Sequence, residues 1–190
     1  MKKLIVFLSI VVLFTNCKNN SHRYTQNSKE IETVKTTINY YDYHQWDSLA
    51  FSYADTAKIY YNSRKHILAP SDLKTYFTRN SESFSTRAFE DESREYEMIE
   101  DNNGKRWVNF WGLWKGHLKA NNKEIIIPVH ITYQFEKGKI VTEFGYWNTG
   151  ELEEELKIIA SQKKVVEDTK EDVNKVIEEI EKIEDIEETD

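Results

Sequence analysis

Few residues in this 190-residue sequence have the types and spacings that enzyme chemistry requires. His44, His66, His117 and His130 share no spacing typical of a metal site, so neither a metal nor another cofactor is expected. The sequence also lacks a Gly-rich phosphate loop and a nucleophile elbow. Its single cysteine, Cys17, has no partner for an internal disulfide. Candidate chemistry therefore rests on carboxyl, hydroxyl and amide side chains.

Cys17 ends a segment that is organised like a secretory signal peptide. Lys2-Lys3 precedes an almost wholly apolar run, Leu4 to Phe14, which is too short to span a bilayer. A cysteine at the cleavage position resembles the lipobox of bacterial lipoproteins, in which the thiol is lipidated and becomes the new N-terminus. The resemblance implies export and a membrane anchor in the cell envelope through Cys17, and Lys18 favours the outer membrane. The alternative is an ordinary signal peptide with a chance cysteine.

Charge and aromatic content divide the chain near residue 150. Residues 1–150 contain all five tryptophans and have a net charge of +3, from 17 acidic and 20 basic residues. Residues 151–190 contain no aromatic residue and have a net charge of −10, from 16 acidic residues and 6 lysines. The acidic tail would repel phosphate and no basic stripe is present, so nucleic-acid binding is not expected.

Apolar periodicity predicts helices first and strands afterwards. Ile31, Val34, Ile38 and Tyr41 form one stripe of a helix that starts at Lys29. The further expected elements are a short helix around residues 49–54, a strand over 57–61, a helix capped by Ser71 in Pro70-Ser71-Asp72, and strands over Arg94–Glu100, Arg106–Leu118, Glu124–Glu136 and Ile140–Asn148. Asp101-Asn102-Asn103-Gly104 is a hairpin signal, and Pro128 predicts a bulge or a sheet edge. Helices followed by an antiparallel meander indicate an α+β fold.

Four short motifs in this order resemble the nuclear transport factor 2-like fold, and within it the SnoaL-like and ketosteroid-isomerase-like domains. They are Trp46-Asp47, Tyr53-Ala54-Asp55, Gly138-Lys139-Ile140-Val141 and Tyr146-Trp147-Asn148. The resemblance implies a cone, in which a curved antiparallel sheet wraps the N-terminal helices around a pocket, and often a homodimer through the outer face of the sheet. The chain then divides into a lipoprotein signal peptide (1–16), a polar tether (17–28), the cone domain (29–152) and an acidic helical tail (153–190).

The same resemblance indicates which residues face the pocket. The position of the ketosteroid-isomerase base falls on Tyr61 and that of the second acid falls near Ile131, so isomerase chemistry of that type is not expected. The correspondence points Glu143, Gly145 and Trp147 into the cone. A glutamate on an apolar, aromatic face should have a raised pKa, which makes Glu143 the candidate general base or polar anchor. The alternative is that Glu143 faces solvent or pairs with a Lys or Arg.

Tyr61, Asn109, Trp111 and Trp147 are the candidate walls of the ligand pocket, and the alternative is that they are simply core. His130 lies on the polar face of its strand and is expected to point outward. The leading interpretation is a lipid-anchored envelope domain that binds a small apolar or aromatic ligand. Two alternatives stay open. One is an enzyme of cyclase, hydratase or hydrolase type that uses Glu143 for proton transfer, and the other is an interaction module whose pocket is plugged by its own aromatics.

The acidic tail has an incomplete heptad pattern. Ile159, Val166, Val173 and Ile180 lie seven residues apart, which predicts a helix that pairs with a copy of itself or with the body. A solvated, partly helical tail is the alternative.

Overall fold

The computed structural model describes the backbone of residues 23–187 and the side chains of residues 23–178. The predicted signal peptide and Cys17 lie outside the described residues. The elements are β1 (Tyr24–Thr25), α2 (Lys29–Asp42), α3 (Trp46–Ala50), β2 (Tyr53–Tyr61), the 3-10 turn η1 (Pro70–Asp72), α4 (Leu73–Ser81), β3 (Phe84–Phe89), the 3-10 turn η2 (Asp91–Ser93), β4 (Glu95–Glu100), β5 (Arg106–Leu118), β6 (Glu124–Glu136), β7 (Lys139–Trp147) and α5 (Gly150–Glu187).

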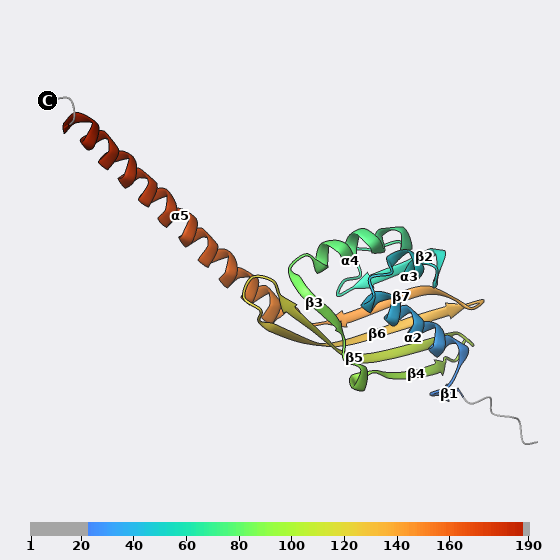
Figure 1. The fold of residues 1–190 in the computed structure, drawn as a ribbon. Helices are drawn as coiled ribbons and strands as arrows, with labels where there is room; N and C mark the ends of the chain where they lie inside the picture. Colours follow the sequence, from blue (N-terminus) through green and yellow to red (C-terminus); the bar gives the residue numbers. More distant parts are fainter. Residues whose placement is uncertain (1–22, 188–190) are drawn as a thin grey trace, which may run out of the picture.

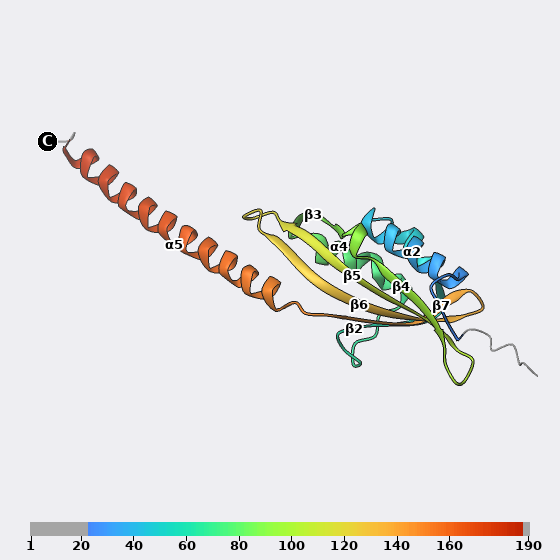
Figure 2. The same cartoon turned by 90° about the horizontal axis from the view of Figure 1, so that it is seen from below.

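The strands form one curved sheet with α2, α3 and α4 against its concave face (Figures 1 and 2). The strand order is β1-β4-β5-β6-β7-β2, and β3 pairs with the C-terminal half of β5. The predicted α+β cone is therefore confirmed. The sheet is mixed rather than wholly antiparallel, because β2 runs parallel to β7 at one edge. β2 enters the sheet from the helices and not through a hairpin, so no tight turn forces it to be antiparallel.

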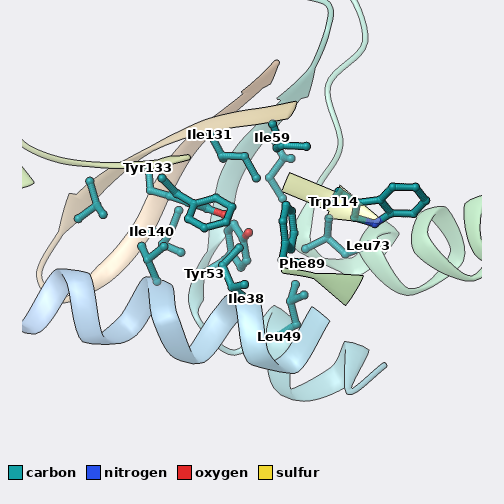
Figure 3. Packing of buried hydrophobic residues seen from close by; sticks show 14 of the residues in the cluster. Ile38, Leu49, Tyr53, Ile59, Leu73, Phe89, Trp114, Ile131, Tyr133 and Ile140 are labelled. Carbon is teal, nitrogen blue, oxygen red and sulfur yellow. The ribbon is translucent and has the colours of Figure 1, made fainter. Parts of the chain in front are cut away.

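The helices and the sheet enclose one apolar core. The predicted stripe of α2 is buried, and Ser28 caps this helix by accepting a hydrogen bond from the Ile31 N–H at 3.2 Å. Figure 3 shows Ile38 of α2 below Tyr53 and Tyr133 of the sheet. Complete burial of a side chain such as Ile59 stabilises the fold by about 1.5–3 kcal/mol.

Two local predictions differ from the structure. The short helix ends at Ala50, and Tyr53 already belongs to β2, because Tyr53 pairs with β7. Ser71 does not cap α4. Instead, Asp72 accepts a hydrogen bond from the Ala69 N–H at 2.8 Å. Of the two outcomes predicted at Pro128, the structure has the sheet edge, because the pairing of β6 with β7 begins one residue later, at Val129.

The predicted tether also contributes to the sheet. Tyr24 and Thr25 pair with Ile99 and Met98 of β4, so the chain joins the sheet edge before the first helix begins. No described helix is both long and apolar enough to cross a membrane.

The C-terminal helix α5 projects away from the body as one continuous helix of 38 residues (Figures 1 and 2). Only its first turns are attached. Leu152 and Ile159 pack against the core, and Glu155 accepts hydrogen bonds from Asn121 and Lys123 of the β5–β6 turn at 2.7 and 2.6 Å.

Beyond the attached turns, every described side chain of α5 over residues 160–178 is exposed. The tail is thus a regular helix and not a partly helical segment, and it pairs with the body only at its start. Pairing of α5 with a second copy stays a prediction.

Candidate functional site

A cavity of about 510 Å³ lies between the concave face of the sheet and the helices. Aliphatic side chains of β6 and aromatic side chains of β2, β3, β5 and α4 line its interior. Its mouth is lined by Arg79, Glu82 and Thr149, and by Leu152 and Leu156 from the first turns of α5. An apolar interior with few polar groups is typical of a small-molecule site. The aromatics therefore do not plug the cone, as the interaction-module alternative required.

Glu143 of β7 is the buried acid of this cavity, with 2% of its surface exposed. A bulge in β7 turns it inward. Gln134 and Phe135 of β6 pair with Thr142 and Ile140, so Val141 is an extra residue and Ile140 and Glu143 face the same side. The Tyr53 hydroxyl donates a hydrogen bond to Glu143 Oε2 at 2.5 Å.

Burial controls the ionisation of Glu143. Loss of solvation raises its pKa from 4.5 to about 7, although the hydroxyls of Tyr53 and Tyr61 oppose this shift by stabilising the carboxylate. No described Lys or Arg forms an ion pair with Glu143. A carboxyl group with a pKa near 7 can both accept and return a proton at neutral pH.

The tyrosines around Glu143 are held in their neutral form. Burial raises the pKa of Tyr53, Tyr61 and Tyr133 well above 10, and the Glu143 charge raises each of them further. The pKa of Tyr76, at the edge of this group, is raised less, and burial is again the main cause. These hydroxyls therefore remain hydrogen-bond donors at neutral pH.

Gly145 gives Tyr61 and Trp147 room to pack against each other in the cavity wall, with their rings tilted and their centroids 5.1 Å apart. A Cβ at this position would lie 2.5 Å from Trp147 Cζ3 and 2.8 Å from Tyr61 Cδ1. The structure therefore brings Glu143, Tyr61 and Trp147 together in one cavity.

Asn109 and Trp111 do not line this cavity, and their prediction as pocket walls is wrong. The buried residues of β5 have even numbers, so both of these side chains lie on the outer face of the sheet. Asn109 donates a hydrogen bond to Glu97 at 2.9 Å, and Trp111 stacks on His130 with ring centroids 5.0 Å apart. His130 is thus on the outer face, as its strand pattern predicted.

The position predicted for a second isomerase acid also lies at the cavity, but Ile131 is a buried apolar residue of its wall. Two residues of the cavity, Tyr53 and Arg87 of β3, were not predicted from the sequence, and Tyr53 was expected in a helix. Arg87 is 8% exposed and lines the same cavity. An arginine in a strand that begins and ends with a buried phenylalanine, Phe84 and Phe89, is a signal that could have identified it. Within residues 23–178, no cluster of three or more His, Cys, Asp or Glu side chains could hold a metal ion.

By sequence, the chain matches no family profile and no curated protein. Its fold matches solved structures. One is a protein from Xanthomonas campestris pv. campestris assigned as a polyketide cyclase, with a TM-score of 0.55, 13% identity, and coverage of 67% of this chain and 96% of that chain. Another is assigned as a SnoaL-like polyketide cyclase from Shewanella denitrificans OS-217, with a TM-score of 0.53, 13% identity, and coverage of 69% and 98%.

A third match is TerC co-crystallised with polyporic acid, with a TM-score of 0.53, 11% identity, and coverage of 67% and 97%. These likenesses concern the fold, because the identities are low. The chain has the nuclear transport factor 2-like fold, which it shares with these solved structures.

Proposed function

We propose that this protein binds a small, largely apolar or aromatic molecule in the cavity and that Glu143 exchanges a proton with it. The observation that carries the proposal is a buried carboxyl group, hydrogen-bonded to the Tyr53 hydroxyl, in an open cavity of about 510 Å³. The volume is ample for a bicyclic or tricyclic ring system. TerC, which shares the fold, was co-crystallised with polyporic acid, and this supports a small ligand in a cavity of this type.

The chemistry follows from the state of Glu143. As a carboxylate it would remove a proton from an acidic C–H or O–H of the ligand, leaving the bonding electron pair on the ligand and becoming a neutral acid. It would then return the proton to the same or another ligand atom. The neutral tyrosine hydroxyls nearby can donate hydrogen bonds to the negative charge that develops. This reaction class includes cyclisation and enolisation.

Hydrogen–deuterium exchange tests proton transfer without knowledge of the natural ligand. The probe is 2-tetralone, a bicyclic ketone with acidic hydrogens beside its carbonyl, and the readout is deuterium uptake at that carbon by NMR in D₂O. We expect the protein to accelerate uptake, with a rate that rises through about pH 7 as Glu143 ionises. Glu143→Gln should lower the rate acceleration by about 10²–10⁴-fold, which is the usual contribution of a general base.

The matched control is Glu82→Gln, which makes the same change at an exposed residue of the cavity mouth. It should leave the exchange rate unchanged. Binding of 2-tetralone without accelerated exchange, or equal rates for Glu143→Gln and the unmodified protein, would reduce the proposal to a binding function.

We also propose that the mature chain is anchored to the cell envelope through lipidated Cys17. The support is the sequence alone: a basic start, a short apolar run and a cysteine at the cleavage position. Mass spectrometry of the N-terminal peptide should find a diacylated or triacylated Cys17, and Cys17→Ser should release the protein from the membrane fraction. An unmodified thiol at Cys17 would instead indicate an ordinary signal peptide.

A further inference from the structure

Arg87 is a second buried polar group in the cavity, and four of its five N–H donors have no partner among the described residues. Its Nε donates to Ser81 Oγ at 2.7 Å, and the Ser81 hydroxyl donates to the Phe77 carbonyl. Among the described residues, neither Nη1 nor Nη2 has a hydrogen-bond partner, and both are buried. Buried guanidinium nitrogens without partners are rare, because the loss of solvation is not compensated.

The surroundings of Arg87 hold its side chain without neutralising its charge. The guanidinium carbon lies 4.2 Å from the ring centroid of Tyr41 and 5.0 Å from that of Trp46, which are cation–π distances. The nearby carboxylate of Asp42 is already engaged, because it accepts hydrogen bonds from Arg94 and from the Phe89 N–H. Nη1 and Nη2 therefore have no anionic partner among the described residues.

A bulge directs Arg87 into the cavity, as one does for Glu143. Phe84 pairs with Leu118 and Thr86 with His117, so Ser85 is an extra residue in β3. Phe84 and Arg87, three residues apart, consequently both face inward. Bulges often re-aim a side chain beside an active site.

We propose that Arg87 binds a carboxylate of the ligand through Nη1 and Nη2, so that the cavity accepts planar, largely apolar carboxylic acids. The inference rests on the proposed function, since it names the class of molecule that the cavity takes. Two parallel guanidinium N–H groups match the two oxygens of one carboxylate, a pairing that a lysine cannot reproduce.

Arg87 and Glu143 serve different parts of one ligand. They share no hydrogen-bond partner, because Arg87 bonds to Ser81 and Glu143 to Tyr53. The influences on the pKa of Glu143 are its burial and two tyrosine hydroxyls, and the Arg87 charge is not among them. A ligand carboxylate at Arg87 would thus leave the proton-exchanging group free for another ligand atom.

The test compares two probes of the same shape, 2-naphthoate and 2-naphthamide, by quenching of tryptophan fluorescence at pH 6. At this pH the naphthoate is ionised, whereas Glu143, with its pKa of about 7, is mostly neutral and does not repel it. We expect the unmodified protein to bind naphthoate at least about tenfold more tightly than the amide, the range of a charge-assisted hydrogen bond. Arg87→Gln should remove this preference while retaining binding of the amide.

Arg64→Gln is the matched control, because Arg64 is an exposed arginine that does not line the cavity. It should keep the preference for naphthoate. Equal affinities of the two probes for the unmodified protein would overturn the carboxylate inference and leave the proposed cavity function standing, even if Arg87→Gln failed to fold. An equal loss of preference in Arg64→Gln would also overturn it, because general charge attraction would then explain the selectivity. If neither probe bound, both the inference and the proposed function would be refuted.

Discussion

Replacement of Glu143 by glutamine should change how the stability of the protein depends on pH. The pKa of this carboxyl is raised from 4.5 to about 7 in the folded state. Between these values the unfolded chain has released its proton while the folded chain keeps it, so the free energy of unfolding falls as the pH rises. Above about pH 7 the Glu143 carboxyl is ionised in both states, and the folded state bears the full free-energy cost of the buried charge.

The magnitude follows from about 1.4 kcal/mol for each tenfold change in proton affinity. Between pH 4.5 and pH 8, Glu143 should lower the free energy of unfolding by about 3 kcal/mol, an order-of-magnitude figure for a fully buried group. Glu143→Gln has nearly the same shape but does not titrate, so the variant should lack this loss. At pH 8 the variant should be at least as stable as the unmodified protein, which is unusual for a change at a buried polar residue.

The assay is urea unfolding followed by tryptophan fluorescence at both pH values, for the unmodified protein, Glu143→Gln and Glu82→Gln. The difference between the first two proteins isolates Glu143, because every other titrating group is common to them. Glu82→Gln should track the unmodified protein. A difference below about 1 kcal/mol across this pH range would refute the reasoning, since it would mean that Glu143 is solvated or paired with a cation.

Three further changes test other contacts. Gly145→Ala would place a Cβ 2.5 Å from Trp147 Cζ3, so it should lower the free energy of unfolding by about 1–3 kcal/mol in urea titrations and weaken binding of 2-tetralone. Asp42→Ala removes the 2.7 Å partner of the largely buried Arg94 and should cost about 3 kcal/mol, measured in the same way. Truncation after residue 160 removes the exposed part of α5, so the thermal midpoint of the body should shift by less than about 2 °C in calorimetry.

Periodicity was sufficient to predict the regular parts of the fold. The stripe of α2 and the clean alternation of Glu124–Glu136 each have one buried face, so their patterns in the sequence match their patterns of burial. The parallel pairing of β2 with β7 could not be predicted in this way, because it joins segments that are distant in sequence and no turn chemistry links them.

The candidate walls show why strand register matters. Trp111 pairs with His130 across β5 and β6, and residues directly opposite on neighbouring strands share a face. An outward His130 therefore requires an outward Trp111. The sequence alone led to an outward His130 and an inward Trp111, because the register of the two long strands depends on the turn between them. A shift of one residue reverses the faces.

Strict alternation of inward and outward side chains along a strand also fails to predict the two polar groups of the cavity, Glu143 and Arg87. With a strict two-residue period, an inward Ile140 would turn Thr142 and Phe144 inward and place Glu143 on the outer face. The extra residue in β7 reverses this order, and the extra residue in β3 does the same for Arg87. Each bulge thus moves a charged side chain from solvent into an apolar cavity, at a cost in solvation that no ion pair among the described residues offsets. Two such departures, directed into one cavity from different strands, are better explained by recognition of a ligand than by stability of the fold.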